Sequence, residues 1–166
     1  MSIFSPALLQ SATHCLAQLR ARGWTLATAE SCTGGLLGAL VTEIPGSSAV
    51  FTHGYITYAN AAKIAMLGVD AALLAAHGAV SEAVARAMAE GAQTQSAATL
   101  AVAITGIAGP GGATAEKPVG RVHIACARAG GVTLHAQHDF HGDRGAVRLQ
   151  AVEAALALVT QALAVV

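Results

Sequence analysis

One stretch of eight residues, TLAVAITG at 99–106, limits the possible folds more than any other part of the chain. It is almost wholly apolar, which is typical of a central strand that is covered on both faces. A helical pattern that starts after Ser81 precedes it, and a long helical pattern from Gly142 to Leu163 closes the chain. A strand hidden between helices predicts a layered α/β fold.

The remaining segments continue this alternation of helices and strands. A helix is expected from Pro6 to Arg22 with Ser5 as N-cap, because proline is favoured at the first helical position. The other expected segments are a strand at 24–29, a turn and helix at 32–44, a strand at 49–58, a short helix through Lys63 to Leu67, another at 71–78, and a hairpin turning at 130–131. Early alternation followed by a late hairpin predicts a single domain over residues 1–166. Its fold should be a three-layer α/β/α sandwich around a mixed, mostly parallel sheet.

Composition narrows the classes of function. Hydrophobic residues make up 54% of the chain, charged residues only 11%, and the formal net charge is zero. No basic stripe is present, which argues against a protein that binds nucleic acid by neutralising phosphates. A surface with so few charges predicts apolar area inside a subunit interface, and therefore a homo-oligomer.

The cysteines and the apolar runs indicate a cytoplasmic protein with no membrane contact. Three cysteines, widely spaced and without a CxxC pair, are typical of reduced intracellular thiols. No basic segment precedes an apolar one near the start, so no signal peptide is predicted. The longest apolar-rich run, AALALVTQALAVV, has 13 residues and is too short to span a bilayer.

Two glycine-rich loops follow expected strands. AESCTGG at 29–35 runs from a strand into a helix start, where free backbone N–H groups could bind a phosphate, with hydroxyl groups from Ser31 and Thr33. The alternative is an ordinary N-cap with glycines for a tight turn. TGIAGPGG at 105–112 leaves the most apolar strand. Ligands gather at the carboxyl ends of strands in α/β sheets, so the two loops could share a pocket, or both could be simple connections.

Lys63 is one of only two lysines, and it closes the stretch GYITYANAAK at 54–63. A lysine in an apolar setting has a lowered pKa, because burial disfavours its charged form. A neutral lysine beside a serine can activate the hydroxyl without a histidine. The candidate serines are Ser31, Ser47 and Ser48, and Tyr58 could orient the amine or relay a proton. On spacing alone, an exposed lysine at a helix start is the competing interpretation.

Other polar clusters give weaker signals. Histidines at three-residue spacing could bind a metal with nearby aspartates, but on a strand they would alternate between faces. Those residues are His135, His138, His141, Asp139 and Asp143. A Ser-His-Asp triad is compatible with the composition, although no GxSxG motif is present. Arg144 and Arg148 lie four apart on one helical face and could bind a phosphate or carboxylate, or pair with nearby acids on the surface.

Four long motifs carry a resemblance to a known family. They are TAESCTGGLLGALVTEIPGSSAVFTHGYITYANAAK, HGAVSEAVARAMAEGA, AVAITGIAGPGGATAEKPVGRVHIA and HGDRGAVRLQAV. Over about residues 5 to 163 the chain resembles the CinA C-terminal domain family, whose stand-alone members include PncC-type amidohydrolases. The resemblance implies that nicotinamide mononucleotide is hydrolysed to nicotinic acid mononucleotide and ammonia, by a Ser/Lys mechanism without a metal or other cofactor.

The resemblance also implies roles for individual residues. Ser48 is expected to be the nucleophile and Lys63 the general base, with Tyr58 assisting. Ser31 is expected in the same site and competes with Ser48 for the role of nucleophile. Thr105 and neighbouring amides of the glycine-rich loop are expected to hold the oxyanion. The expected contacts to substrate or phosphate are Thr33, Gly34, Gly35, Asn60, Thr105, Gly106 and Arg144.

The chain departs from the family pattern beside the expected base. Family members commonly read Tyr-Ser-Asn-Glu-Ala-Lys where this chain has Tyr58-Ala59-Asn60-Ala61-Ala62-Lys63. A hydroxyl and a carboxylate are therefore missing. This departure leaves two alternatives open: a pyridine-nucleotide-binding or assembly module without catalysis, and hydrolysis of a different amide or of a phosphate ester.

Overall fold

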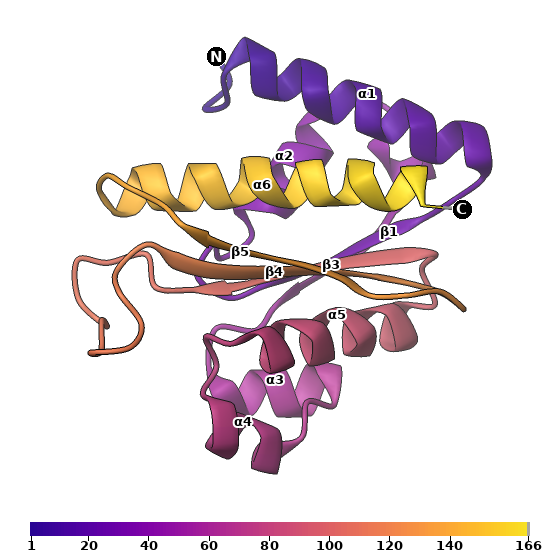
Figure 1. The fold of residues 1–166 in the computed structure, drawn as a ribbon. Helices are drawn as coiled ribbons and strands as arrows, with labels where there is room; N and C mark the ends of the chain where they lie inside the picture. Colours follow the sequence, from indigo (N-terminus) through magenta and orange to yellow (C-terminus); the bar gives the residue numbers. More distant parts are fainter. Residues whose placement is uncertain (166) are drawn as a thin grey trace.

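The computed structural model describes residues 1–165, which form a five-stranded sheet between two layers of helices (Figure 1). In chain order the elements are α1 (Pro6–Arg22), β1 (Leu26–Glu30), α2 (Leu36–Glu43), the 3-10 turn η1 (Ser47–Ala49), β2 (Phe51–Ile56), α3 (Asn60–Leu67), α4 (Ala71–His77), α5 (Glu82–Ser96), β3 (Leu100–Gly106), β4 (Arg121–Arg128), β5 (Leu134–Asp139) and α6 (Arg144–Ala164). The order of helices and strands expected from the sequence is confirmed, with η1 as an addition.

The sheet is mixed and open, with strand order β2-β1-β3-β4-β5. β1 pairs in parallel with both β2 and β3, whereas β4 pairs antiparallel with β3 and β5. The predicted α/β/α sandwich is therefore confirmed, with two parallel and two antiparallel pairs. Because β1, β2 and β3 run in the same direction, their carboxyl ends lie at one edge of the sheet. The chain passes from β1 to its neighbour β2 on one side, and later reaches β3 on the other side of β1. The carboxyl end of β1 is therefore the topological switch point of the sheet.

Side-chain size alternates along the buried strands and gives each helix layer a different surface. On β3, Leu100, Val102 and Ile104 belong to the core that α1, α2 and α6 cover. Ala101 and Ala103 belong to the opposite core, which α5 covers with Ala85, Met88, Ala89 and Ala92. The alanines on the strand and most of those on α5 leave little bulk between the helix and the sheet, while the bulkier face packs against α6. The apolar strand is thus covered on both sides, as its composition predicts.

α6 is a core helix even though its length and apolar composition would also suit a membrane span. Half of its most apolar window is buried inside the protein. Val152, Leu156 and Val159 are among its residues in the core. In Figure 1 this helix lies flat across the sheet beside α1.

Candidate active site

Lys63 projects from α3 into the protein rather than into solvent. Lys63 is only 1% exposed, yet it lines a pocket. Nζ lies 3.0 Å from Ser31 Oγ, 2.8 Å from the carbonyl oxygen of Thr57 and 3.3 Å from that of Tyr58. Ser31 follows the end of β1 and Thr57 follows the end of β2, so the parallel pairing of these strands creates the contact.

The surroundings of Lys63 favour its neutral form. Burial lowers the pKa of this lysine from its ordinary value of 10.5, and the nearby Cys32 opposes the shift. Within residues 1–165, no carboxylate forms an ion pair with it. The two carbonyl oxygens can only accept, so they take two amine protons. In the neutral amine, the remaining lone pair then faces the Ser31 hydroxyl, which is the geometry a general base needs.

A pocket of about 260 Å³ opens over this pair. Its walls come from the ends of β1, β2 and β3 and from the start of α6. The lining residues are Ser31, Cys32, Tyr58, Asn60, Lys63, Ala79, Val80, Thr105, Gly106, Ile107, Ala108, Gly109, Gly111, Gly112 and Arg144. Lys63 and Arg144 are the basic residues of this lining, and none of the lining residues is acidic. Such a lining suits an anionic ligand. The predicted shared pocket of the two glycine-rich loops is present at this edge.

Arg144 joins three parts of the pocket. Its guanidinium donates to the carbonyl of Gly109 at 2.7 Å and to the hydroxyl of Tyr58 at 3.0 Å. Two of its five N–H groups are thereby used, and the others can reach a phosphate. Arg148, one turn later on α6, donates instead to the carbonyls of Cys32 and Thr33. It fixes the turn that carries Ser31 and does not line the pocket.

Ser48 lies at the other end of β2 from this pocket. It belongs to η1, which precedes β2, whereas Lys63 comes after β2 has ended. A strand of this length is about 17–20 Å long, so the Ser48 hydroxyl is far from the amine. The structure therefore corrects the predicted pairing of Ser48 with Lys63. It places Ser31 beside the amine instead.

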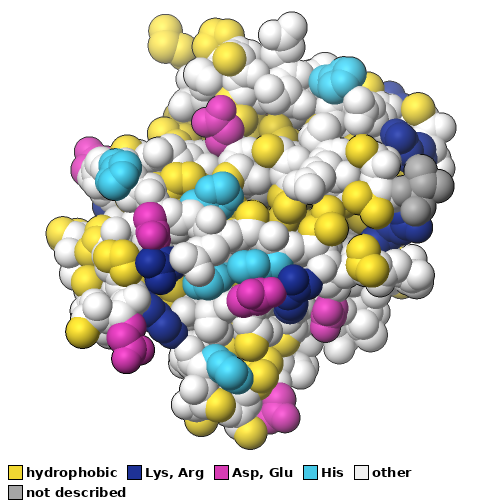
Figure 2. Space-filling view, viewed as in Figure 1, with side chains coloured by type: hydrophobic (Ala, Val, Ile, Leu, Met, Phe, Trp, Pro, Cys, Tyr) yellow, Lys and Arg dark blue, Asp and Glu magenta, His cyan; other side chains and the backbone are white. Residues whose placement is uncertain are grey.

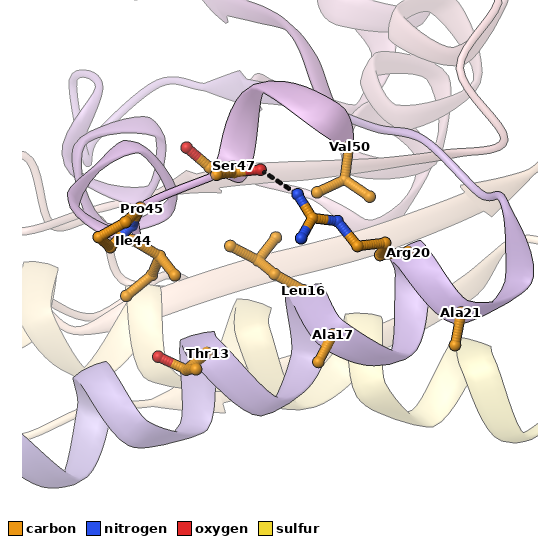
Figure 3. Close-up of a pocket in the computed structure, with 10 residues that line it drawn as sticks. Thr13, Leu16, Ala17, Arg20, Ala21, Ile44, Pro45, Ser47 and Val50 are labelled. Atoms are coloured by element: carbon orange, nitrogen blue, oxygen red, sulfur yellow. Dashed lines mark hydrogen bonds between the residues drawn. The ribbon is translucent and has the colours of Figure 1, made fainter.

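A second hollow, of about 300 Å³, lies near Ser48 between α1 and the 44–50 segment (Figure 3). Its walls include Leu16, Ile44 and Val50, and its one charged residue is Arg20, which donates to the carbonyl of Gly46. Although it is the larger of the two, it pairs no hydroxyl with a base. The chemistry points to the Lys63 pocket.

The start of α2 is closed to an external anion by the protein's own carboxylate. Glu30 is 1% exposed and accepts backbone N–H groups from Gly35, Leu37 and Gly38 at 2.8–3.2 Å. These amides are the ones that a phosphate would need. None of the three residues predicted to contact a phosphate there, Thr33, Gly34 and Gly35, lines the pocket, and the Gly35 amide is already taken by Glu30. Glu30, which the loop pattern alone does not single out, is the residue that sequence reasoning missed.

Two further predicted residues lie in the pocket with different contacts from those expected. The Thr105 hydroxyl donates to the carbonyl of Ala79 at 2.8 Å, so its proton is not free for an oxyanion. The ring of Tyr58 is 60% exposed and reaches Arg144, while its backbone carbonyl, not its hydroxyl, contacts Lys63. Asn60 and Gly106 line the pocket as expected.

Cys32 follows Ser31 directly, so its backbone amide comes next in the chain after the serine. In the described part of the chain its N–H has no hydrogen-bond acceptor from another residue. Burial raises the pKa of the Cys32 thiol to about 11, so the sulfur stays protonated and unreactive near neutral pH. An amide directly after a nucleophile is a common oxyanion donor.

The histidines at the far edge of the sheet form a separate group. His123 on β4 lies 3.1 Å from His135 on β5, and His135 lies 3.6 Å from Glu82 on α5. His138 stacks on Phe140 instead. Within the described residues no three His, Cys, Asp or Glu side chains converge as metal ligands.

Comparisons with known proteins identify relatives of this chain. The family model for the CinA C-terminal domain matches residues 9–163. A CinA-like protein of Anaeromyxobacter sp. (strain Fw109-5) is 54% identical over 98% of this chain, which spans only 39% of that relative. A protein of Enterobacter agglomerans named nicotinamide-nucleotide amidohydrolase PncC is 52% identical, covering 81% of this chain and 82% of that protein.

Solved structures extend the match to three dimensions. The crystal structure of competence/damage inducible protein CihA from Agrobacterium tumefaciens has a TM-score of 0.95 and 45% identity, with 99% of both chains covered. A CinA superfamily protein from Klebsiella pneumoniae has a TM-score of 0.91 and 39% identity, with 95% of this chain and 98% of that chain covered. The chain belongs to the CinA C-terminal domain family.

Proposed function

We propose that this protein hydrolyses the carboxamide of nicotinamide mononucleotide to nicotinic acid mononucleotide and ammonia, with Ser31 as nucleophile and Lys63 as general base. The observation that carries the proposal is the buried Lys63 amine 3.0 Å from the Ser31 hydroxyl. The PncC relative supports the substrate, because its name gives it the corresponding activity.

The first half of the reaction forms an ester on Ser31. The neutral Lys63 amine takes the Ser31 proton while Oγ attacks the carboxamide carbon. Negative charge develops on the carboxamide oxygen, and the Cys32 amide, with amides of the glycine-rich loop, stabilises it. The protonated Lys63 then gives its proton to the nitrogen, the C–N bond breaks, and ammonia leaves.

The second half returns the enzyme to its starting state. Lys63 is neutral again and takes a proton from a water molecule that attacks the ester carbon. The C–Oγ bond breaks, Lys63 returns the proton to Ser31, and nicotinic acid mononucleotide is released. The substrate phosphate is placed at Arg144, whose guanidinium already lies at the pocket wall. Such a substrate and three buried free cysteines fit a cytoplasmic location.

The test is ammonia release from nicotinamide mononucleotide, with nicotinic acid mononucleotide identified by mass spectrometry. Ser31→Ala and Lys63→Met are each expected to lower kcat by at least about 10³-fold, as removal of members of a catalytic unit does. Ser48→Ala is the matched control and should retain activity within about twofold. Loss of activity in Ser48→Ala together with retention in Ser31→Ala would reject the assignment of the nucleophile.

The non-catalytic alternative rests on the departures Ala59 and Ala61. Both side chains are exposed and neither lines the pocket, so the absent hydroxyl and carboxylate do not remove a group from the Ser31–Lys63 pair. If the wild-type protein bound the nucleotide in a thermal-shift assay but released no ammonia from it, the binding module would be the better description.

A further inference from the structure

The loop between β3 and β4 forms one wall of the pocket and is fastened mainly at its base. Residues 107–120 extend beyond the point where β3 and β4 cease to pair, at Gly106 and Val122. Ile107 N–H donates to Arg121, and Gly120 N–H donates back to Ile107. Ala108, Gly109, Gly111 and Gly112 line the pocket beyond this base. In Figure 1 the loop projects from the edge of the sheet on which the pocket lies.

Lys117 ties the outer part of this loop to a helix on the other side of the pocket. Its Nζ donates to the carbonyl of His77, the last residue of α4, at 2.7 Å. Carbonyl groups at a helix end have no partner within the helix, so a cationic donor satisfies one of them. Gly78 leaves room for the amine: a Cβ at this position would lie 3.1 Å from Nζ. Two hydrogen bonds between Thr114 and Lys117 hold the turn from which the side chain projects.

The residue that accepts the Lys117 hydrogen bond, His77, lies just before the opposite wall of the pocket in the chain. His77 and Gly78 are followed by Ala79 and Val80, which line it. Ala79 is itself held by the Thr105 hydroxyl at the end of β3. Lys117 therefore joins the glycine-rich wall to a wall that the sheet already fixes. Arg144 fastens the same loop at Gly109, nearer its base.

We propose that Lys117 is a positioning residue that latches the glycine-rich loop over the pocket and thereby sets the affinity for the substrate. Without the latch, only a fraction of molecules hold the loop in its binding position, and the apparent affinity falls by that fraction. A bound substrate reorders the loop, so the chemical step itself is unchanged. The kinetic part of this inference rests on the proposed amidohydrolase function, whereas the ordering of the loop does not.

The experiment compares Lys117→Met with the wild type by steady-state kinetics and by amide hydrogen exchange without ligand. The methionine keeps much of the stem and removes the amine. We expect KM for nicotinamide mononucleotide to rise about tenfold, the effect of losing one charge-assisted hydrogen bond. We expect kcat to stay within about twofold. Exchange should become faster in residues 107–116 and remain unchanged in β3.

Three further variants separate the latch from general damage to the loop. Lys117→Arg keeps a cationic donor and should restore much of the affinity, whereas Lys117→Gln, which donates without a charge, should fall between the two. Glu116→Gln changes the neighbouring exposed residue and should match the wild type in both measurements. Unchanged exchange and KM in Lys117→Met would overturn the latch. A fall in kcat at constant KM would instead assign Lys117 to the chemistry. If the wild type hydrolysed no nucleotide, the exchange comparison would still decide whether Lys117 orders the loop.

Discussion

Lys63 is held in a position that costs the folded state free energy and serves the proposed chemistry. Burial lowers its pKa in the folded protein, whereas the unfolded chain keeps the ordinary value. Between these two pKa values the unfolded state binds more protons, so stability rises with pH across that interval. Below the folded pKa the buried amine is charged, and the fold carries the full cost. Placement of such a group without an acidic partner is typical of a functional site.

The pH dependence of activity should report the protonation of Lys63. Only the neutral amine can accept the Ser31 proton, so kcat should rise with pH, with its midpoint below the ordinary lysine value of 10.5. Measurement of kcat between about pH 5 and pH 9 checks this rise, the ascending limb of the pH profile. In Lys63→Ala the limb should vanish, and added methylamine should restore part of the rate. A wild-type kcat that did not vary with pH would contradict the role of Lys63 as base.

At the scale of helices and strands, the direction of each strand decides which residues meet. Ser31 and Thr57 come together because β1 and β2 are parallel and both end at the same edge. Ser48 is close to β2 in sequence but lies where that strand begins. The rule that ligands gather at carboxyl ends therefore predicts the pocket from the sequence, and it disfavours Ser48 once the strands are taken as parallel.

Other features of the site depend on contacts that the sequence pattern does not contain. Whether the helix start at Gly35 remains open for a phosphate depends on the rotamer of Glu30, which folds back onto it. The Thr105 hydroxyl donates its hydrogen bond to the carbonyl of Ala79, a residue 26 positions earlier in the chain, and is therefore not available to an oxyanion. Such contacts arise from packing between distant segments. Local propensity and spacing predict the elements but not these hydrogen bonds.

One departure from the family pattern lies at the start of α3 and gives a test. Ala59 is the N-cap and makes no side-chain hydrogen bond there, so a serine at this position would accept a free helical N–H. Ala59→Ser should raise the free energy of unfolding by about 0.5–1 kcal/mol, measured by urea denaturation, with kcat unchanged. Ala61→Ser, inside the first turn, is the control and should give no such gain. Equal gains from both substitutions would argue against capping.

At the scale of the whole molecule, charged side chains are few. On the face shown in Figure 2, acidic, basic and histidine side chains are interspersed among apolar and uncharged ones. Several exposed apolar side chains lie near the β2 edge, namely Ile56, Tyr58, Ile64 and Met66. The homo-oligomer expected from the composition stays a prediction. Of the two paired histidines between β4 and β5, His123 is buried and His135 is partly buried.

Acid should destabilise the fold through His123. Burial, together with the neighbouring His135, Arg121 and Lys117, lowers the pKa of His123 from 6.5 to about 4, although Glu82 acts in the opposite direction. The unfolded state therefore binds the proton first, and stability falls as pH drops from about 6.5 toward about 4. Urea denaturation at several pH values should show a smaller fall in His123→Gln than in the wild type. His14→Gln, on the exposed face of α1, should behave as the wild type does. Equal slopes in all three proteins would contradict this source of acid sensitivity.

The burial of Lys63 has a practical consequence for labelling. Of the two lysine side chains, Lys63 is enclosed and Lys117 is only partly covered, so an amine-reactive dye would modify the lysines almost exclusively at Lys117. A fluorophore attached there would replace the contact with His77 and stand at the mouth of the pocket. If the pocket binds a nucleotide as proposed, the emission would change as the nucleotide enters and leaves, and the labelled protein would report its own occupancy.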